Sequence, residues 1–211
     1  MSDPDRTLGL ILAGGNARRM GGGDKALLAL GGKPMLSHTI ERLAPQCRAL
    51  ALNANGDGGR FVAFALPVIS DERQDFSGPL AGLLAGLDYC ARDLPEVTHV
   101  VSLPADTPFA PRDLAVRLHE ARRSFGAEIA VARSGDHEHH LAALWPVTIV
   151  EALRDALHGE DARKVGSFAA RFKLAHADWP IKPFDPFFNV NTPADLARAE
   201  AILREGSGGD V

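Results

Sequence analysis

Strand-like and helix-like segments alternate along this chain, and the alternation constrains the fold more than any other feature. The first strand-like segment is LGLIL at residues 8–12, and a helical pattern follows at residues 34–43 with Pro34 in its first turn. Such alternation predicts an α/β sandwich of three layers around a mostly parallel, Rossmann-like sheet. Further strands are expected at residues 48–53, 66–70, 98–104, 127–132, 140–145 and 174–177, and further helices at 79–91, 111–124, 147–157 and 162–172.

The end of the chain reads as an extended stretch that turns into a last helix. Thr192 is a good N-cap, Pro193 follows at the first helical position, and Asp195 occupies the third. Neither an internal repeat nor an interdomain linker interrupts the pattern. The sequence therefore predicts one domain over residues 1–205, with residues 206–211 as a disordered tail.

Composition narrows the classes of function. The chain has 211 residues, a formal net charge of −4 and a pI near 6.0, which leaves no basic footprint for nucleic acid. The two cysteines, Cys47 and Cys90, lie far apart without metal-ligand spacing, which is typical of buried thiols in a reducing compartment. No apolar run is long enough to cross a membrane, and the opening MSDPDRTLGL lacks the pattern of a signal peptide. A cytoplasmic protein is expected.

The loop after the first strand combines glycines with cations. Residues 10–25 read LILAGGNARRMGGGDK, so Arg18, Arg19 and Lys25 lie among five glycines. Glycines let a ligand approach the backbone, and exposed N–H groups beside cations suit an anion such as phosphate. The alternative is a flexible surface loop with solvated charges. Neither a Walker A loop nor a GxGxxG fingerprint occurs here.

Polar residues follow several of the predicted strands. Asn53 ends one such strand, and Asp71 and Asp106 lie just after two others, as the glycine loop does after the first. Ligands of open α/β sheets bind beyond the carboxyl ends of the strands, so one crevice is expected to collect all of these residues. Asp106 suits a magnesium ion that takes its other oxygens from substrate phosphates. The alternative for all three residues is ordinary turn chemistry, with Asp106 capping a turn before Pro108.

Motifs along nearly the whole chain resemble those of the molybdenum cofactor guanylyltransferases. They are LAGGNARRMGGGDK at residues 12–25, GKPML, the NAN of residues 53–55, DERQDFSGPLAG at 71–82, LPADTPF at 103–109, HLAALWP and FFNVNTPADL. The resemblance implies a fold of the nucleotide-diphospho-sugar transferase type. It also implies transfer of GMP from magnesium-bound GTP to the terminal phosphate of molybdopterin, with release of pyrophosphate. Ala105 departs from the family pattern, since relatives often have cysteine there.

The resemblance, combined with phosphoryl-transfer chemistry, gives roles to single residues. Lys25 would stabilise the reacting phosphate, Arg19 would clamp the triphosphate or the incoming cofactor phosphate, and Asp106 would hold Mg²⁺. A solvated pair is the alternative for Arg18 and Arg19, and the resemblance favours Arg19 as the functional member. The complete expected nucleotide site is Leu12, Ala13, Gly14, Gly15, Gly22, Lys25, Asn53, Asp71, Gly78, Gly82 and Asp106.

Within this site the backbone N–H groups of Ala13, Gly14 and Gly15 are expected to cradle phosphates. Asn53 and Asp71 would read the base or the ribose, because guanine offers N1–H and N2–H₂ donors beside the O6 acceptor. Gly78 and Gly82 are interpreted as positions of close approach to the nucleotide. Asn189 and Asn191 share one side of an extended segment, which the resemblance assigns to the cofactor side of the site. Capping of the last helix is the alternative for these two asparagines.

Some features and rival functions stay outside this assignment. The run DHEHH contains His137, His139 and His140, and an exposed polar turn is expected there rather than a zinc site. The rivals are a cytidylyltransferase for the same cofactor, a sugar-nucleotide pyrophosphorylase, and a catalytically silent nucleotide-binding subunit in molybdoenzyme assembly. Expected partners are GTP and molybdopterin, with transient contacts to molybdenum-insertion proteins and to apo-molybdoenzymes or their chaperones.

Overall fold

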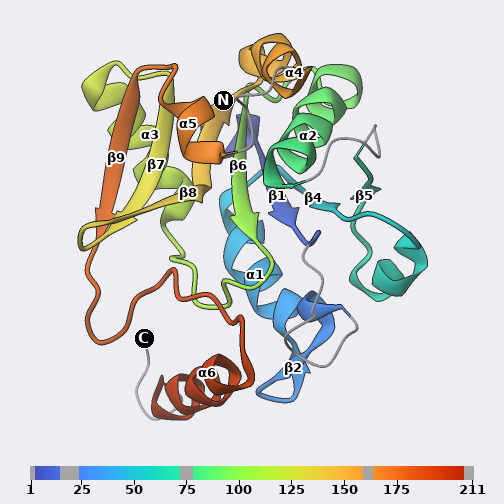
Figure 1. The fold of residues 1–211 in the computed structure, drawn as a ribbon, viewed down its shortest axis with the longest axis vertical. Coiled ribbons are helices and arrows are strands. Elements are labelled where there is room, and N and C mark those ends of the chain that lie inside the picture. Colours follow the sequence, from blue (N-terminus) through green and yellow to red (C-terminus); the bar gives the residue numbers. More distant parts are fainter. Residues whose placement is uncertain (1–2, 15–23, 72–77, 159–163, 207–211) are drawn as a thin grey trace.

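The computed structural model describes residues 3–14, 24–71, 78–158 and 164–206, and a seven-stranded sheet forms its centre (Figure 1). The strand order is β5-β4-β1-β6-β8-β7-β9, and β8 alone runs antiparallel to its neighbours. The mostly parallel sheet is therefore confirmed. The strands are β1 (Thr7–Leu12), β4 (Ala49–Asn53), β5 (Val68–Ile69), β6 (His99–Pro104), β7 (Ile129–Ser134), β8 (His137–Pro146) and β9 (Leu174–Trp179), and β2 (Ala29–Leu30) pairs separately with β3 (Lys33–Pro34).

Helices cover both faces of this sheet and complete the three predicted layers. The alternation of β1 explains the arrangement, because Leu8 and Leu10 join the apolar cluster on one face and Ile11 joins the cluster on the other. Both clusters consist of buried apolar side chains, most of them aliphatic. The Ile11 face is covered by α1 (Met35–Leu43) and α3 (Leu114–Phe125), and the opposite face by α2 (Pro79–Asp93), α4 (Val150–His158) and α5 (Val165–Ala169).

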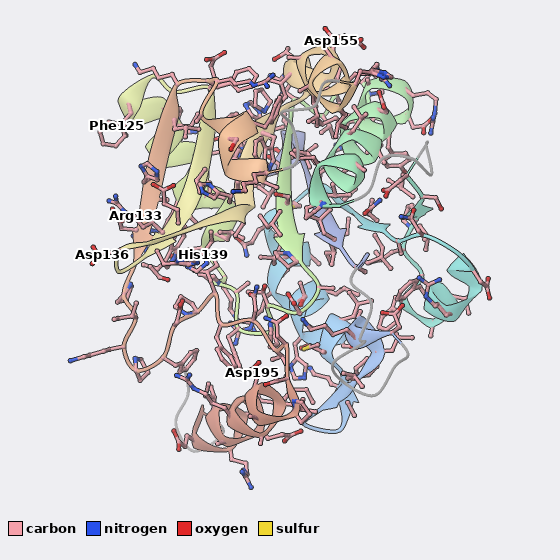
Figure 2. All side chains as sticks on the ribbon, viewed as in Figure 1. Phe125, Arg133, Asp136, His139, Asp155 and Asp195 are labelled. Atoms are coloured by element: carbon pink, nitrogen blue, oxygen red, sulfur yellow. The ribbon has the colours of Figure 1, made fainter. Side chains whose placement is uncertain are left out.

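The last helix, α6 (Pro193–Gly206), packs against the β2–β3 hairpin through a small separate core that contains Leu30, Met35, Phe109, Val190 and Ala199. Its first turn is a capping box, which confirms the predicted cap. The Asp195 N–H donates to Thr192 Oγ1 at 3.2 Å, and the Thr192 N–H donates to Asp195 Oδ2 at 2.8 Å. Figure 2 shows Asp195 at the start of this helix. The cap fixes the segment that carries Asn189 and Asn191.

The histidine run differs from its predicted structure. A two-residue turn at Gly135 and Asp136 closes the β7–β8 hairpin, so His137 and His139 pair with β7 inside strand β8 (Figure 2). The His139 ring stacks on Phe187 with centroids 4.5 Å apart, and burial lowers its pKa to about 4. The predicted exposed turn is wrong, because the glycine with a φ of 56° lets the chain reverse before the histidines.

Two boundaries also differ. The helix expected from residue 111 begins at Leu114, and the pattern at 162–172 yields only the short α5, with residues 159–163 outside the described part. Within the described residues no helix is long and apolar enough to cross a membrane. The predicted tail is likewise not described beyond Gly206, where α6 ends.

Candidate nucleotide-binding site

A cavity of about 260 Å³ opens at the carboxyl ends of the parallel strands. It is lined by residues at or just beyond the ends of β1, β4, β5 and β6, together with Lys25, Ala26, the start of α2 and one residue of β8, so the predicted crevice exists. Eight of the expected site residues line it: Leu12, Ala13, Gly14, Lys25, Asn53, Asp71, Gly78 and Asp106. The remaining lining residues were not predicted as site residues: Ala26, Asn55, Pro79, Pro104, Ala105 and Leu141.

At one end of the cavity Lys25 lies between two acceptors from distant parts of the chain. Its Nζ forms an ion pair with Asp106 Oδ2 and donates to Asn191 Oδ1 at 2.6 Å. The side chains of Lys25 and Asp106 are only 13% and 18% exposed, so their charges are poorly screened by water. We call this end, which consists of Gly14, Lys25, Asp106 and Asn191, the phosphate end.

The loop that carries Asp106 is held on both sides. The Ala105 N–H donates to the Leu12 carbonyl at 3.0 Å, and the Val190 N–H donates to the Asp106 carbonyl at 3.0 Å. Asn189 does not line the cavity, because its Oδ1 accepts from Thr107 Oγ1 at 3.1 Å. Asn191 instead reaches Lys25, so the two asparagines fasten the segment before α6 to two different parts of the site.

Asp106 also fits a divalent cation. Its Oδ1 atom is buried and has no hydrogen-bond partner among the described residues, although a buried carboxylate oxygen ordinarily has one. Hard cations such as Mg²⁺ and Mn²⁺ prefer carboxylate oxygens and complete their shell with waters and substrate phosphates. Within the described residues no group of three metal-ligating side chains occurs, so substrate oxygens would have to complete such a site.

The opposite end of the cavity is a closed hydrogen-bond network around Asp71. Asn53 Nδ2 donates to Asp71 Oδ1 at 2.8 Å and to the Ile69 carbonyl at 3.1 Å. Asn55 Nδ2 donates to Asp71 Oδ2 at 2.7 Å, and the Asp71 N–H donates back to Asn55 Oδ1 at 2.9 Å. Each carboxylate oxygen therefore has one protein donor and keeps one acceptor site. We call Asn53, Asn55 and Asp71 the base end.

This network changes the expected role of Asn53. Both amide hydrogens of Asn53 are engaged by Asp71 and Ile69, so the amide is not available for guanine O6.

Gly82 has a related function. It does not line the cavity, and a Cβ there would lie 2.2 Å from Asn53 Oδ1. Glycine is required at residue 82 to leave room for Asn53, rather than for the nucleotide.

The glycine loop is described only at its two ends, up to Gly14 and from Asp24. The Ala13 N–H donates to the Asn53 carbonyl at 2.9 Å, so it continues the β1–β4 ladder and is not free to cradle a phosphate. Gly14 lines the cavity and has open space beside its Cα, and Gly78 lines it with a φ of 109° that favours glycine. Gly15, Arg19 and Gly22 lie outside the described residues.

Three polar residues of this region were missed in the sequence. Asn55 could have been found, because the spacing of Asn53 and Asn55 places both side chains on one side of an extended segment. Asp24 and Arg60 join through Arg60 Nε and Asp24 Oδ2 at 2.7 Å. Arg60 belongs to the 3₁₀ helix η5 (Gly58–Phe64), for which the sequence contains no periodic signal.

A lysine paired with a carboxylate that suits a divalent cation, at the carboxyl edge of a Rossmann-like sheet, fits a nucleotidyltransferase. Residues 9–175 match the family model described as a MobA-like NTP transferase domain. The molybdenum cofactor guanylyltransferase of Rhodopseudomonas palustris strain BisB5 is 54% identical over 207 residues, which cover 98% of this chain and 99% of the relative. The chain belongs to the molybdenum cofactor guanylyltransferase family.

Solved structures agree on the fold. Molybdopterin-guanine dinucleotide biosynthesis protein A from Archaeoglobus fulgidus superposes with a TM-score of 0.73 at 23% identity, covering 94% of this chain and 99% of that one. A Mycobacterium tuberculosis protein solved as a complex with manganese gives a TM-score of 0.68 at 20% identity, covering 93% and 98%. The predicted nucleotidyltransferase fold is thereby confirmed.

Proposed function

We propose that this protein transfers GMP from GTP to the terminal phosphate of molybdopterin. An oxygen of the molybdopterin phosphate forms a bond to the α-phosphorus, the bond from that phosphorus to the β-bridging oxygen breaks, and pyrophosphate leaves with the bonding electrons. The single observation that carries the proposal is the contrast within one cavity. A carboxylate held by two asparagine amides lies at one end, and a lysine paired with a carboxylate that has one unpartnered oxygen among the described residues lies at the other.

The base end favours guanine over cytosine. The two Asp71 oxygens, each with one acceptor site left, match the adjacent N1–H and N2–H₂ donors of guanine. Cytosine presents only one donor group on that edge, next to acceptor atoms that a carboxylate would repel. This chemistry supports a guanylyltransferase rather than the cytidylyltransferase alternative.

The phosphate end supplies charge where the reaction needs it. Lys25 would donate to the reacting phosphate and to the departing pyrophosphate, and Gly14 would bring its backbone close to the phosphate chain. Asp106 would hold Mg²⁺, which when bound neutralises phosphate charge and orients the triphosphate. Arg19, Gly15 and Gly22 remain proposed members of this end, and Asn189 and Asn191 remain proposed contacts toward the cofactor.

The test is to incubate the protein with GTP, Mg²⁺ and molybdopterin and to identify the product. Molybdopterin guanine dinucleotide with one pyrophosphate per turnover is expected, and CTP should give little of the cytosine product. Product from CTP at the same rate would overturn the guanine assignment. Absence of pyrophosphate release with every nucleotide would instead favour the silent nucleotide-binding subunit.

The cellular setting follows from this activity as a further part of the proposal. The reaction would take place in the cytoplasm. Its product would pass to apo-molybdoenzymes or their chaperones through transient contacts, and molybdenum-insertion proteins would supply the molybdopterin substrate. Neither nucleic acid nor a membrane is needed for any step of this reaction.

A further inference from the structure

Arg60 connects the two ends of the cavity. Its guanidinium donates through Nε to Asp24 Oδ2 at 2.7 Å, through one terminal nitrogen to the Asn55 carbonyl at 2.8 Å, and through the other to the Asp57 carbonyl. The group also lies over the Phe61 ring, 4.5 Å from its centroid, and Phe61 is 1% exposed. A single half-buried side chain thus engages three acceptors from two loops.

Two of these acceptors, those of Asp24 and Asn55, lie one step from a proposed functional group. Asp24 directly precedes Lys25, and its Oδ1 accepts from the Ala26 N–H at 3.2 Å, which caps the 3₁₀ helix η3 (Lys25–Leu27) that carries the lysine. Asn55 exchanges two hydrogen bonds with Asp71. Arg60 therefore fixes the start of the Lys25 helix on one side and the backbone of the Asp71 network on the other.

We infer that Arg60 is a positioning residue that couples recognition of the base to alignment of Lys25. This inference rests on the proposed function, since it needs Asp71 to read guanine and Lys25 to act on phosphate. The planar guanidinium is suited to the task because its donors are fixed at set angles. A lysine could keep the charge, but it would not reach all three acceptors in one geometry.

The experiment compares Arg60→Ala and Arg60→Lys with wild type and with Arg48→Ala as a matched control. Arg48 also flanks β4 and donates through Nε to Glu96 at 2.8 Å, but it precedes the strand and so lies at the edge opposite the cavity. Two quantities are measured: the ratio of the affinities for GTP and for ITP, which lacks the N2 amino group, and the single-turnover rate of pyrophosphate release with molybdopterin.

For Arg60→Ala we expect the ratio of GTP to ITP affinity and the single-turnover rate each to fall about tenfold. The reason is that the charge-assisted hydrogen bonds to Asp24 and to the Asn55 carbonyl are both lost. Millimolar guanidinium should restore part of both quantities. Arg60→Lys should fall between Arg60→Ala and wild type, and Arg48→Ala should match wild type in both. A general loss of folding would lower activity in proportion to the melting temperature, without changing the GTP to ITP ratio.

Several results would overturn the inference. An Arg60→Ala protein that keeps the wild-type ratio and rate, or that loses only one of them, would show that Arg60 does not couple the two ends. If the wild-type protein bound GTP and ITP equally, the proposed contact between Asp71 and the N2 amino group of guanine would be wrong. If the wild type preferred GTP and Arg60→Ala kept that preference, only the proposed role of Arg60 would be wrong.

Discussion

The base end and the phosphate end of the cavity are built in opposite ways. At the base end Asn53, Asn55 and Asp71 hold one another through three hydrogen bonds, and Asn53 donates a fourth to the Ile69 carbonyl, so the carboxylate is oriented before any ligand arrives. At the phosphate end Lys25 and Asp106 come from separate loops, and one buried carboxylate oxygen has no partner among the described residues. This difference fits the proposed division of labour, in which the base end would select the nucleotide and the phosphate end would carry the chemistry.

The strongest test of this contrast is Asp106→Asn. The amide keeps the shape of the side chain but removes the charge that would hold the cation, so turnover should fall about a thousandfold or more. Pyrophosphate release measured across a range of Mg²⁺ concentrations checks this expectation. Asp93→Asn, at the exposed end of α2, is the control and should match wild type. Full activity of Asp106→Asn would place the metal elsewhere.

Lys25→Ala should have the next largest effect. Loss of a cation aimed at the reacting phosphate lowers the rate by about a hundredfold, because this contact strengthens as negative charge moves to pyrophosphate. GTP affinity should fall far less, since the base end is intact. Lys33→Ala, which removes an exposed pair with Glu41, is the control. Equal losses of rate and affinity would contradict the assignment of chemistry to this end.

Asp71→Asn should give the opposite pattern. The amide can present only one acceptor to the two guanine donors, so GTP affinity should fall about tenfold to a hundredfold. ITP should lose less affinity, because it lacks one of those donors. Calorimetric titration of both nucleotides measures the change, again with Asp93→Asn as the control. If GTP and ITP weakened equally, Asp71 would not be the residue that reads the N2 amino group.

Asn191→Ala should lower the rate about severalfold, since Lys25 keeps its ion pair with Asp106 and loses one neutral acceptor. A double-mutant cycle shows how Asn191 acts. If it positions Lys25, Lys25→Ala combined with Asn191→Ala should be no slower than Lys25→Ala alone. Effects that multiply would mean that Asn191 contacts molybdopterin independently of Lys25.

A change of pH should alter stability without altering the contrast between the two ends. Burial lowers the pKa of His119 to about 4, and burial beside His119 lowers the pKa of His99 to about 3. Arg122, Asp3 and Thr7 also face the His119 ring. In the unfolded chain these histidines bind protons near their ordinary pKa of 6.5, whereas in the folded chain they stay neutral down to about pH 4. The free energy of unfolding therefore decreases as pH falls from 6.5 toward 4.

Each of these histidines should cost about 1–2 kcal/mol of stability at about pH 5 relative to about pH 7.5. Urea unfolding at the two pH values measures the loss, and His119→Gln should reduce it. The GTP to ITP affinity ratio should stay constant over the same range. An unfolding free energy that does not change between the two pH values would contradict the lowered histidine pKa values.

Much of the cavity could be predicted because its residues follow strands. Asn53 is the last residue of β4, Asp71 and Asp106 lie two residues beyond β5 and β6, and the ends of parallel strands meet at one edge whatever the details of packing. The motifs gave the other five predicted lining residues, which are Leu12, Ala13, Gly14, Lys25 and Gly78. Strand–helix alternation sufficed for the layers, since each helix needs only one apolar face to cover the sheet.

Other features depended on contacts that local sequence does not encode. Arg60 meets Asp24 across 36 positions through a 3₁₀ helix without periodicity. The use of the Ala13 N–H followed from the register of β1 with β4, and the need for Gly82 followed from the rotamer of Asn53. His139 looked like a turn residue because it is polar, but the hairpin had already closed at Gly135.

One measurement tests the division of the cavity most directly: the single-turnover rate of pyrophosphate release with molybdopterin, followed at rising GTP for wild type, Lys25→Ala and Asp71→Asn. Lys25→Ala should lower the plateau rate and leave the half-saturating GTP concentration nearly unchanged. Asp71→Asn should raise the half-saturating GTP concentration and keep most of the plateau rate. If both variants changed the same parameter in the same proportion, the two ends would not have separate roles.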